Sequence, residues 1–198
     1  MSLVLAAVSV AGGIVVARVV GALLRSSASS EEPEDDPDNA RTPVPDPFAG
    51  FPCKLGDVLV RRAERDEAWL AGALVFAEER PIAALFVAPE ARQDRAVLVR
   101  DAQPEVTWLL PASGPVDLAG RDPPSALEHE GVRFSRKRRL PVRVERLGTG
   151  APDVGPTAVV AEYTGPGAER FLVVAGAEST LAWRGTALGE LEYDLLPS

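Results

Sequence analysis

Side chains that could do chemistry are sparse in this chain, and the sharpest group is the run of four cations at 136–139, RKRR. Alternating apolar residues flank the run on both sides, which predicts a hairpin tip where the cations are readily solvated. The functional alternative is contact of Arg136, Lys137, Arg138 and Arg139 with an anionic surface, either lipid headgroups or polyphosphate. Near a charged membrane each basic residue contributes about 1 kcal/mol.

The single histidine, His129, stands between Glu128 and Glu130. Neighbouring residues of a strand point to opposite faces, so the two carboxylates share one face while the imidazole lies on the other. A metal site needs ligands that converge. The triplet therefore predicts a solvated strand start, and we expect neither a metal nor a cofactor.

Motifs for nucleophilic catalysis are missing from the sequence. It contains no Gly-x-Ser-x-Gly elbow, and there is no second histidine to serve a triad. The glycines at 148–150 and 165–167 indicate turns, because neither pair joins a strand to a helix. Asp57 and Glu162 keep one enzymatic alternative open, a hydrolase or transferase that works with carboxylates alone. We favour a non-catalytic interaction module.

The elements that would position these residues are strands. From residue 48 onward apolar residues recur with a period of two, for example Val142 and Val144 around Arg143. Proline and glycine interrupt the runs, and no segment after the first 25 residues shows a helical period. The pattern predicts an all-β fold, an antiparallel sandwich or barrel.

The β region repeats itself. Residues 72–88 (GALVFAEERPIAALFVA) resemble residues 157–175 (TAVVAEYTGPGAERFLVVA), with a hairpin in the same place. The repeat predicts two similar half-domains, 48–111 and 126–198, joined by a linker at 112–125 and packed around one core. The alternative is coincidence among small apolar residues.

Several buried residues can also be predicted. The single cysteine, Cys53, makes no intramolecular disulfide, which fits a reducing cytosol, and we expect it in the core together with the three tryptophans. Glu162 and Tyr163 are adjacent in a strand, so one should face the core and the other the surface. A Tyr163 packed inside would need a partner for its hydroxyl.

The first 25 residues predict a transmembrane anchor. Leu3–Leu24 holds twenty-two residues with one charge, and a helix of that length rises about 33 Å, enough to cross a hydrocarbon core of about 30 Å. Its cations, Arg18 and Arg25, lie toward the carboxyl end, so the positive-inside rule places the rest of the chain on the cytoplasmic side of the inner membrane. The alternative is a signal peptide cleaved near Ala28, followed by a secreted domain.

Small residues recur every four positions along this segment, at Ser9, Gly13, Ala17 and Gly21. Such a stripe lets two helices approach closely and would support a homodimer through the anchor. The alternative is that alanine, glycine and valine are simply common in this chain.

Residues 26–47 predict a disordered, acidic, proline-rich tether. They hold seven acidic residues, one arginine and five prolines, and they cannot bury enough apolar surface to offset the entropy of ordering. The remainder, 48–198, carries a net charge of only −4, so the charge does not favour nucleic acid as a partner. The expected partners are the membrane and an unidentified protein.

Short motifs recur along 55–197. The first half carries Gly-Asp and Trp-Leu, and the second half carries Glu-Tyr, Gly-x-x-Arg-x-Leu and a late glycine. The residues concerned are Gly56, Asp57, Trp108, Glu162, Tyr163, Gly167, Arg170 and Gly185. This combination resembles an uncharacterised bacterial family of domains of unknown function, although the first half lacks a Glu-Tyr of its own. The resemblance implies an all-β domain with no assigned activity.

Overall fold

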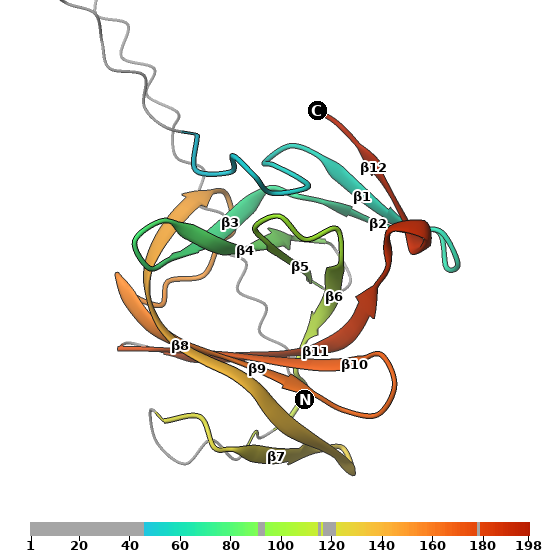
Figure 1. Cartoon of the computed structure of the whole chain (residues 1–198). Coiled ribbons are helices and arrows are strands. Elements are labelled where there is room, and N and C mark those ends of the chain that lie inside the picture. The colour runs from blue at the N-terminus through green and yellow to red at the C-terminus, as the bar shows by residue number, and fades with distance from the viewer. Residues whose placement is uncertain (1–45, 91–93, 115, 117–121, 178) are drawn as a thin grey trace, which may run out of the picture. The chain divides into compact units, whose positions relative to one another are not determined.

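The computed structural model describes residues 46–90, 94–114, 116, 122–177 and 179–198, and these residues form strands and one short 3-10 helix (Figure 1). The predicted all-β fold is confirmed. The elements are β1 Val58–Arg61, β2 Asp66–Trp69, β3 Gly72–Ala77, β4 Pro81–Ala88, β5 Arg95–Arg100, β6 Val106–Pro111, β7 Ala126–His129, β8 Val132–Gly148, β9 Thr157–Thr164, β10 Glu169–Gly176, β11 Thr180–Leu188, η1 Glu190–Glu192 and β12 Tyr193–Leu196.

Eight antiparallel strands close into a barrel, so of the two predicted architectures, sandwich or barrel, the structure has the barrel. The order is β3-β4-β5-β6-β11-β10-β9-β8, and the pairing of β3 with β8 completes the circle. The closing strand, β8, is 17 residues long. Its first residues pair with β7, its middle with β9, and its last residues with β3.

The two predicted halves of the chain both contribute to this barrel. Strands β3–β6 come from the first half and β8–β11 from the second, and the halves meet at the β6–β11 and β3–β8 seams. The two hairpins that resemble each other in sequence are β3–β4 and β9–β10. Both halves supply side chains to one interior cluster. The internal repeat itself stays a prediction.

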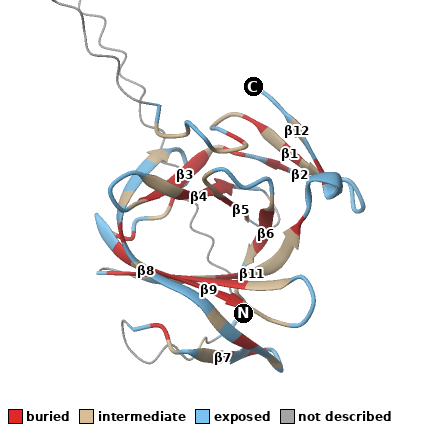
Figure 2. Ribbon diagram, viewed as in Figure 1, coloured by how far each residue is buried: buried red, intermediate tan, exposed pale blue. Residues whose placement is uncertain are grey.

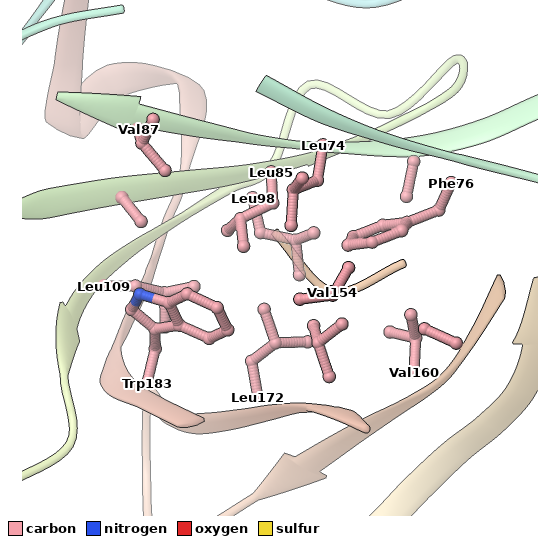
Figure 3. Packing of buried hydrophobic residues seen from close by; sticks show 14 of the residues in the cluster. Leu74, Phe76, Leu85, Val87, Leu98, Leu109, Val154, Val160, Leu172 and Trp183 are labelled. Atoms are coloured by element: carbon pink, nitrogen blue, oxygen red, sulfur yellow. The ribbon is translucent and has the colours of Figure 1, made fainter. Parts of the chain in front are cut away.

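The barrel interior is filled by apolar side chains (Figure 3). Leu74, Phe76 and Leu85 from β3 and β4 point toward Val160 and Leu172 from β9 and β10. Burial of such side chains contributes about 1.5–3 kcal/mol each before the entropy of ordering is subtracted. The closed cylinder therefore has a packed centre.

Two further apolar clusters lie on the outside of the barrel. The three-stranded sheet β12-β1-β2 lies over β3–β6 (Figures 1 and 2). Its Leu59 packs in the same cluster as Phe86 of β4. On the other side the β7–β8 hairpin covers β9 and β10, with Phe134 against Phe171. Strands covered on both faces read as continuous apolar runs rather than alternating ones, which explains runs such as 72–76.

Four local predictions were wrong. Glu162 and Tyr163 were expected to divide between core and surface, but both are buried, because the β7–β8 hairpin covers the outer side of β9 as well. The cations at 136–139 lie inside β8 rather than at a hairpin tip, because the run contains none of the glycine, proline, asparagine or aspartate residues that form turns. His129 is buried, at 5% exposure, because the hairpin folds it onto the barrel. Trp69 is 58% exposed, since Ala68 takes the inward position of β2. The other two tryptophans and Cys53 are buried as predicted.

The predicted anchor at 1–25, its Ser9, Gly13, Ala17 and Gly21 stripe, and nearly all of the tether at 26–47 lie outside the described residues. Among the described residues, no helix has the length and apolar character that crossing a membrane requires.

Candidate functional site

The barrel interior changes from apolar to charged at one end. Here β5 ends at Arg100, β6 is about to begin after Glu105, and β9 and β10 contribute Glu162 and Arg170. The residues at this end line two adjoining hollows, one of about 10 Å³ and one of about 260 Å³. Among the residues predicted from sequence, Glu162, Arg170 and two cations of the 136–139 run meet here.

An ion pair between Arg100 and Glu162 forms the floor of the charged end. Arg100 donates from Nη2 to Glu162 Oε2 and, at 3.4 Å, from Nε to Oε1. The side chains are only 11% and 12% exposed, so each charge depends on the other for its stabilisation. Glu105 Oε1 lies 3.9 Å from Arg100 Nη1 and adds a weaker attraction.

A β-bulge brings two more cations to the same place. The register between β8 and β9 shifts between Arg136 and Arg138, so that Arg138 lies opposite Glu162 and Lys137 is the extra residue. Lys137 and Arg138 line an open hollow of about 260 Å³ together with Arg100 and Glu162. Both are exposed, and neither forms an ion pair with any residue that the structure describes.

The outer cations of the run are used differently. Arg136 donates to the carbonyl of Pro123, and Arg139 forms an ion pair with Asp122 at 2.8 Å. These contacts fasten residues 122–125 to the barrel. The four cations predicted to act together are thus divided, two holding a neighbouring segment and two facing the hollow.

A buried hydroxyl lies behind the ion pair. Thr107 lines the smaller hollow, of about 10 Å³, together with Arg100, Arg170 and Glu162. Its Oγ1 is buried and makes no hydrogen bond with the described part of the chain. Buried polar atoms are normally hydrogen-bonded, so Thr107 leaves an unsatisfied hydroxyl behind the ion pair.

The charged end carries an excess of positive charge. Four cations, from Arg100, Lys137, Arg138 and Arg170, face the two carboxylates of Glu105 and Glu162. The formal excess is two positive charges over the two adjoining hollows taken together, and their low-dielectric walls concentrate the field. Such a site attracts anions, and its guanidinium groups suit phosphate or carboxylate oxygens.

Asp57 lies elsewhere and has a different role. Its Oδ2 accepts a hydrogen bond from the Lys54 backbone at 2.9 Å, and its Oδ1 accepts one from the Ser198 backbone at 3.0 Å. It lines none of the hollows that contain Glu162. The two carboxylates on which the enzymatic alternative depends are therefore not brought together.

The remaining motif residues hold the framework. Tyr163 donates from its hydroxyl to the Pro124 carbonyl at 2.8 Å, and burial raises the pKa of that hydroxyl. A Cβ at Gly185 would lie 1.8 Å from the Trp108 carbonyl, so only glycine lets β11 approach β6. Gly167 has a φ of +59° in the turn before β10.

Two framework residues lie near the small sheet. Gly56 has a φ of +91°, the left-handed conformation that glycine tolerates. The Trp108 ring packs beneath two guanidinium groups, with Arg61 at 5.5 Å and Arg95 at 6.0 Å from its centroid. Both positions stabilise the fold and take no part in the charged end.

His129 is held as a structural residue. Its Nε2 lies 2.8 Å from the Ser113 carbonyl, and its ring centroid lies 5.2 Å from that of Phe171. Within the described ranges, no three histidine, cysteine or acidic residues are grouped so that they could hold a metal ion. The imidazole instead anchors the β7 hairpin on the barrel.

An exposed apolar row crosses the small sheet. Val58 pairs with Trp69 on one side and with Leu196 on the other, and these two neighbours are 58% and 53% exposed. Directly paired residues share a face, so the three side chains form a flat surface on the outside. A flat apolar surface is typical of binding modules rather than of enzymes.

Sequence reasoning missed Arg100 and Thr107. An arginine after an apolar strand ordinarily lies in solvent, and nothing in its neighbours shows that β5 ends inside a barrel. Only the pairing of β5 with β4 and β6, and the position of β9 across the barrel, place Arg100 beside Glu162.

Comparison with known proteins gives no further guide. No family model matches the chain, and no curated protein and no solved structure matches it either.

Proposed function

We propose that this chain is a non-catalytic binding module, held at the cytoplasmic face of the inner membrane by its apolar segment 3–24, whose charged barrel end takes up a phosphate group. The observation that supports the proposal most strongly is the position of Lys137 and Arg138. Both face the same hollow as Arg100, and neither forms an ion pair with a described residue. Unpaired cations crowded against a buried one repel each other, and a bound anion removes that repulsion.

The charge of this barrel end favours phosphate over a single carboxylate. The two adjoining hollows together, with Arg170 included, carry a formal excess of two positive charges, which matches a phosphate monoester with about −1.5 to −2 at pH 7. Arginine and lysine both donate to phosphate oxygens. A lipid headgroup and a free polyphosphate share this chemistry, and the experiment below separates them.

The lining of the hollow argues against catalysis. It consists of Arg100, Gln103, Pro104, Glu105, Lys137, Arg138 and Glu162. None of these is a hydroxyl or thiol nucleophile, and the buried carboxylate, Glu162, is engaged by Arg100. The carboxylate-based hydrolase or transferase therefore finds little support in the geometry. A protein partner stays a prediction, and the exposed row of Trp69, Val58 and Leu196 is a surface that could receive one.

The test is anion-dependent thermal stability of the full chain in detergent, with inorganic tripolyphosphate as the free probe. We expect tripolyphosphate to raise Tm in the wild type, and the Lys137→Ser, Arg138→Ser double variant to lose that increase. Arg143→Ser is the matched control, because Arg143 is an exposed arginine of the same strand that lines neither charged hollow. An equal Tm increase in all three proteins would refute the proposal.

Vesicles distinguish the two sources of phosphate. Flotation with phosphatidic acid vesicles, compared with phosphatidylcholine vesicles, is measured on residues 46–198, after circular dichroism has shown that this fragment folds. Binding to phosphatidic acid that depends on Lys137 and Arg138 identifies a headgroup site. Tripolyphosphate binding without vesicle binding identifies a site for a free anion. Binding to neither the phosphatidic acid vesicles nor tripolyphosphate would contradict the proposal.

A further inference from the structure

The end of the barrel opposite the charged site holds a second hollow. Strand β5 runs from Arg95 to Arg100, so the residues around Arg95 mark the far end of the cylinder. There, a pocket of about 460 Å³ opens above the packed interior. Its walls are mainly apolar and include Val87, Pro111, Leu181 and Trp183. Size and lining fit the usual range for small-ligand sites, about 300–1,000 Å³ with few polar groups.

Trp183 gives this apolar pocket one hydrogen-bond donor. The residue is only 6% exposed, and buried indole N–H groups usually find a partner. Its N–H makes no hydrogen bond with the described residues, yet it is not sealed off as Thr107 Oγ1 is. Figure 3 shows the six-membered ring directed toward Leu172 and the nitrogen on the other side of the indole. The donor is therefore available to an occupant of the pocket.

The charges at the rim decide which occupants are accepted. Arg95 is engaged by Asp66 at 2.8 Å and by Glu90, and its guanidinium also packs over Trp108. Asp94 is exposed and forms no ion pair with the residues that the structure describes. Asp94 is thus a rim carboxylate without a cationic partner among the described residues, and it repels anions.

We infer that this apolar end binds a small neutral molecule, with an apolar body and one acceptor oxygen that receives the N–H of Trp183. The apolar walls take up the body of the ligand, and the indole fixes its orientation. Asp94 excludes carboxylates of the same shape. This site and the phosphate site lie at opposite ends of β5, so occupation of one does not require the other.

Three matched probes test the inference: acetophenone, ethylbenzene and benzoate. They are of similar size, but only the first is both neutral and able to accept a hydrogen bond. The full chain in detergent has three tryptophans, hence three indole cross-peaks in a ¹H–¹⁵N spectrum, assigned with single Trp→Phe variants. Acetophenone should shift the Trp183 peak downfield in proportion to occupancy, and ethylbenzene should bind more weakly. The peak of exposed Trp69 serves as the internal control for non-specific and micellar partitioning.

Variants separate the donor from the apolar walls. Trp183→Phe should weaken acetophenone by about 2- to 13-fold, the value of one hydrogen bond, and change ethylbenzene by less than twofold, measured by calorimetry. Asp94→Asn should let benzoate bind. The inference is overturned if neither neutral probe moves the Trp183 peak. Equal weakening of both neutral ligands in Trp183→Phe would likewise overturn the assigned donor, and so would benzoate binding to the wild type as tightly as acetophenone.

Discussion

Replacing Glu162 by glutamine is the most informative perturbation of the charged end. The amide keeps the size of the side chain but removes the charge that Arg100 needs. Breaking a buried ion pair by removing one partner costs about 3–5 kcal/mol. The pair here is 11% and 12% exposed, and Glu105 lies 3.9 Å from the guanidinium and compensates part of the charge. The expected cost is therefore at or just below the lower limit of that range, about 2–3 kcal/mol.

Urea and thermal unfolding of residues 46–198, once shown to fold, would measure this cost. For a domain of this size each kcal/mol corresponds to about 2–4 °C, so Tm should fall by about 4–12 °C. Replacing both residues, Arg100→Met with Glu162→Met, removes the charges together. It should cost less than the sum of the single variants, because no uncompensated charge remains.

Phosphate supplies a second readout on the same variant. Without the Glu162 carboxylate the hollow gains positive charge, so tripolyphosphate should raise the Tm of Glu162→Gln by more than it raises that of the wild type. The reasoning would be refuted if Glu162→Gln unfolded within about 0.5 kcal/mol of the wild type. Strict additivity of the two methionine substitutions would refute it as well.

Three other perturbations have defined outcomes. Burial, with a smaller contribution from a nearby carboxylate, raises the pKa of the Cys53 thiol from 9.0 to about 12. The contribution of the neutral thiol to the free energy of unfolding is therefore complete below pH 9 and declines toward pH 12. In urea titrations Cys53→Ala should lose less stability than the wild type over this pH range, and the native thiol should not react with Ellman's reagent at pH 8. Tyr163→Phe leaves the Pro124 carbonyl without its donor and should cost about 1 kcal/mol in urea titration; no loss would mean that water replaces the hydroxyl. In Gly185→Ala the new Cβ would lie 1.8 Å from a carbonyl of β6, so the variant should lose about 3 kcal/mol or more of unfolding free energy. Gly167→Ala has open space at its Cβ position and should lose only about 1 kcal/mol, because of its positive φ. Equal losses of stability in the two variants would contradict the steric argument.

The fold class could be predicted because its evidence is local. Alternating residues such as Val142 and Val144 show which side of β8 faces the interior. Apolar and polar residues alternate in this way wherever one face of a strand is exposed to solvent. Closure into a barrel could not be predicted, because it depends on the pairing of β3 with the end of β8, some 70 residues away. The continuous runs in β3 and β10 carry no alternation, since both of their faces are buried.

The charged end was predictable in part. The 136–139 run and Glu162 stood out as charges in or beside apolar strands, but the division of the four cations depends on a bulge. A single extra residue at Lys137 turns Arg138 to the inside of the barrel while Arg139 stays outside. No residue type in the run marks that bulge. His129 was misplaced for a similar reason, because only the docking of the β7 hairpin buries it.

The pairing of β1 with β12 determines when this domain can be complete. Val58 lies opposite Leu196, so β1 cannot pair with β12 until the ribosome has added more than a hundred further residues. Until β12 arrives, the three-stranded sheet lacks one edge, and the apolar outer side of β3–β6 lacks part of its cover. Such long-range strand pairing is slow, and the intermediates that expose apolar surface meanwhile are prone to aggregate. A nascent chain of this kind should therefore depend on chaperones until its final strand emerges.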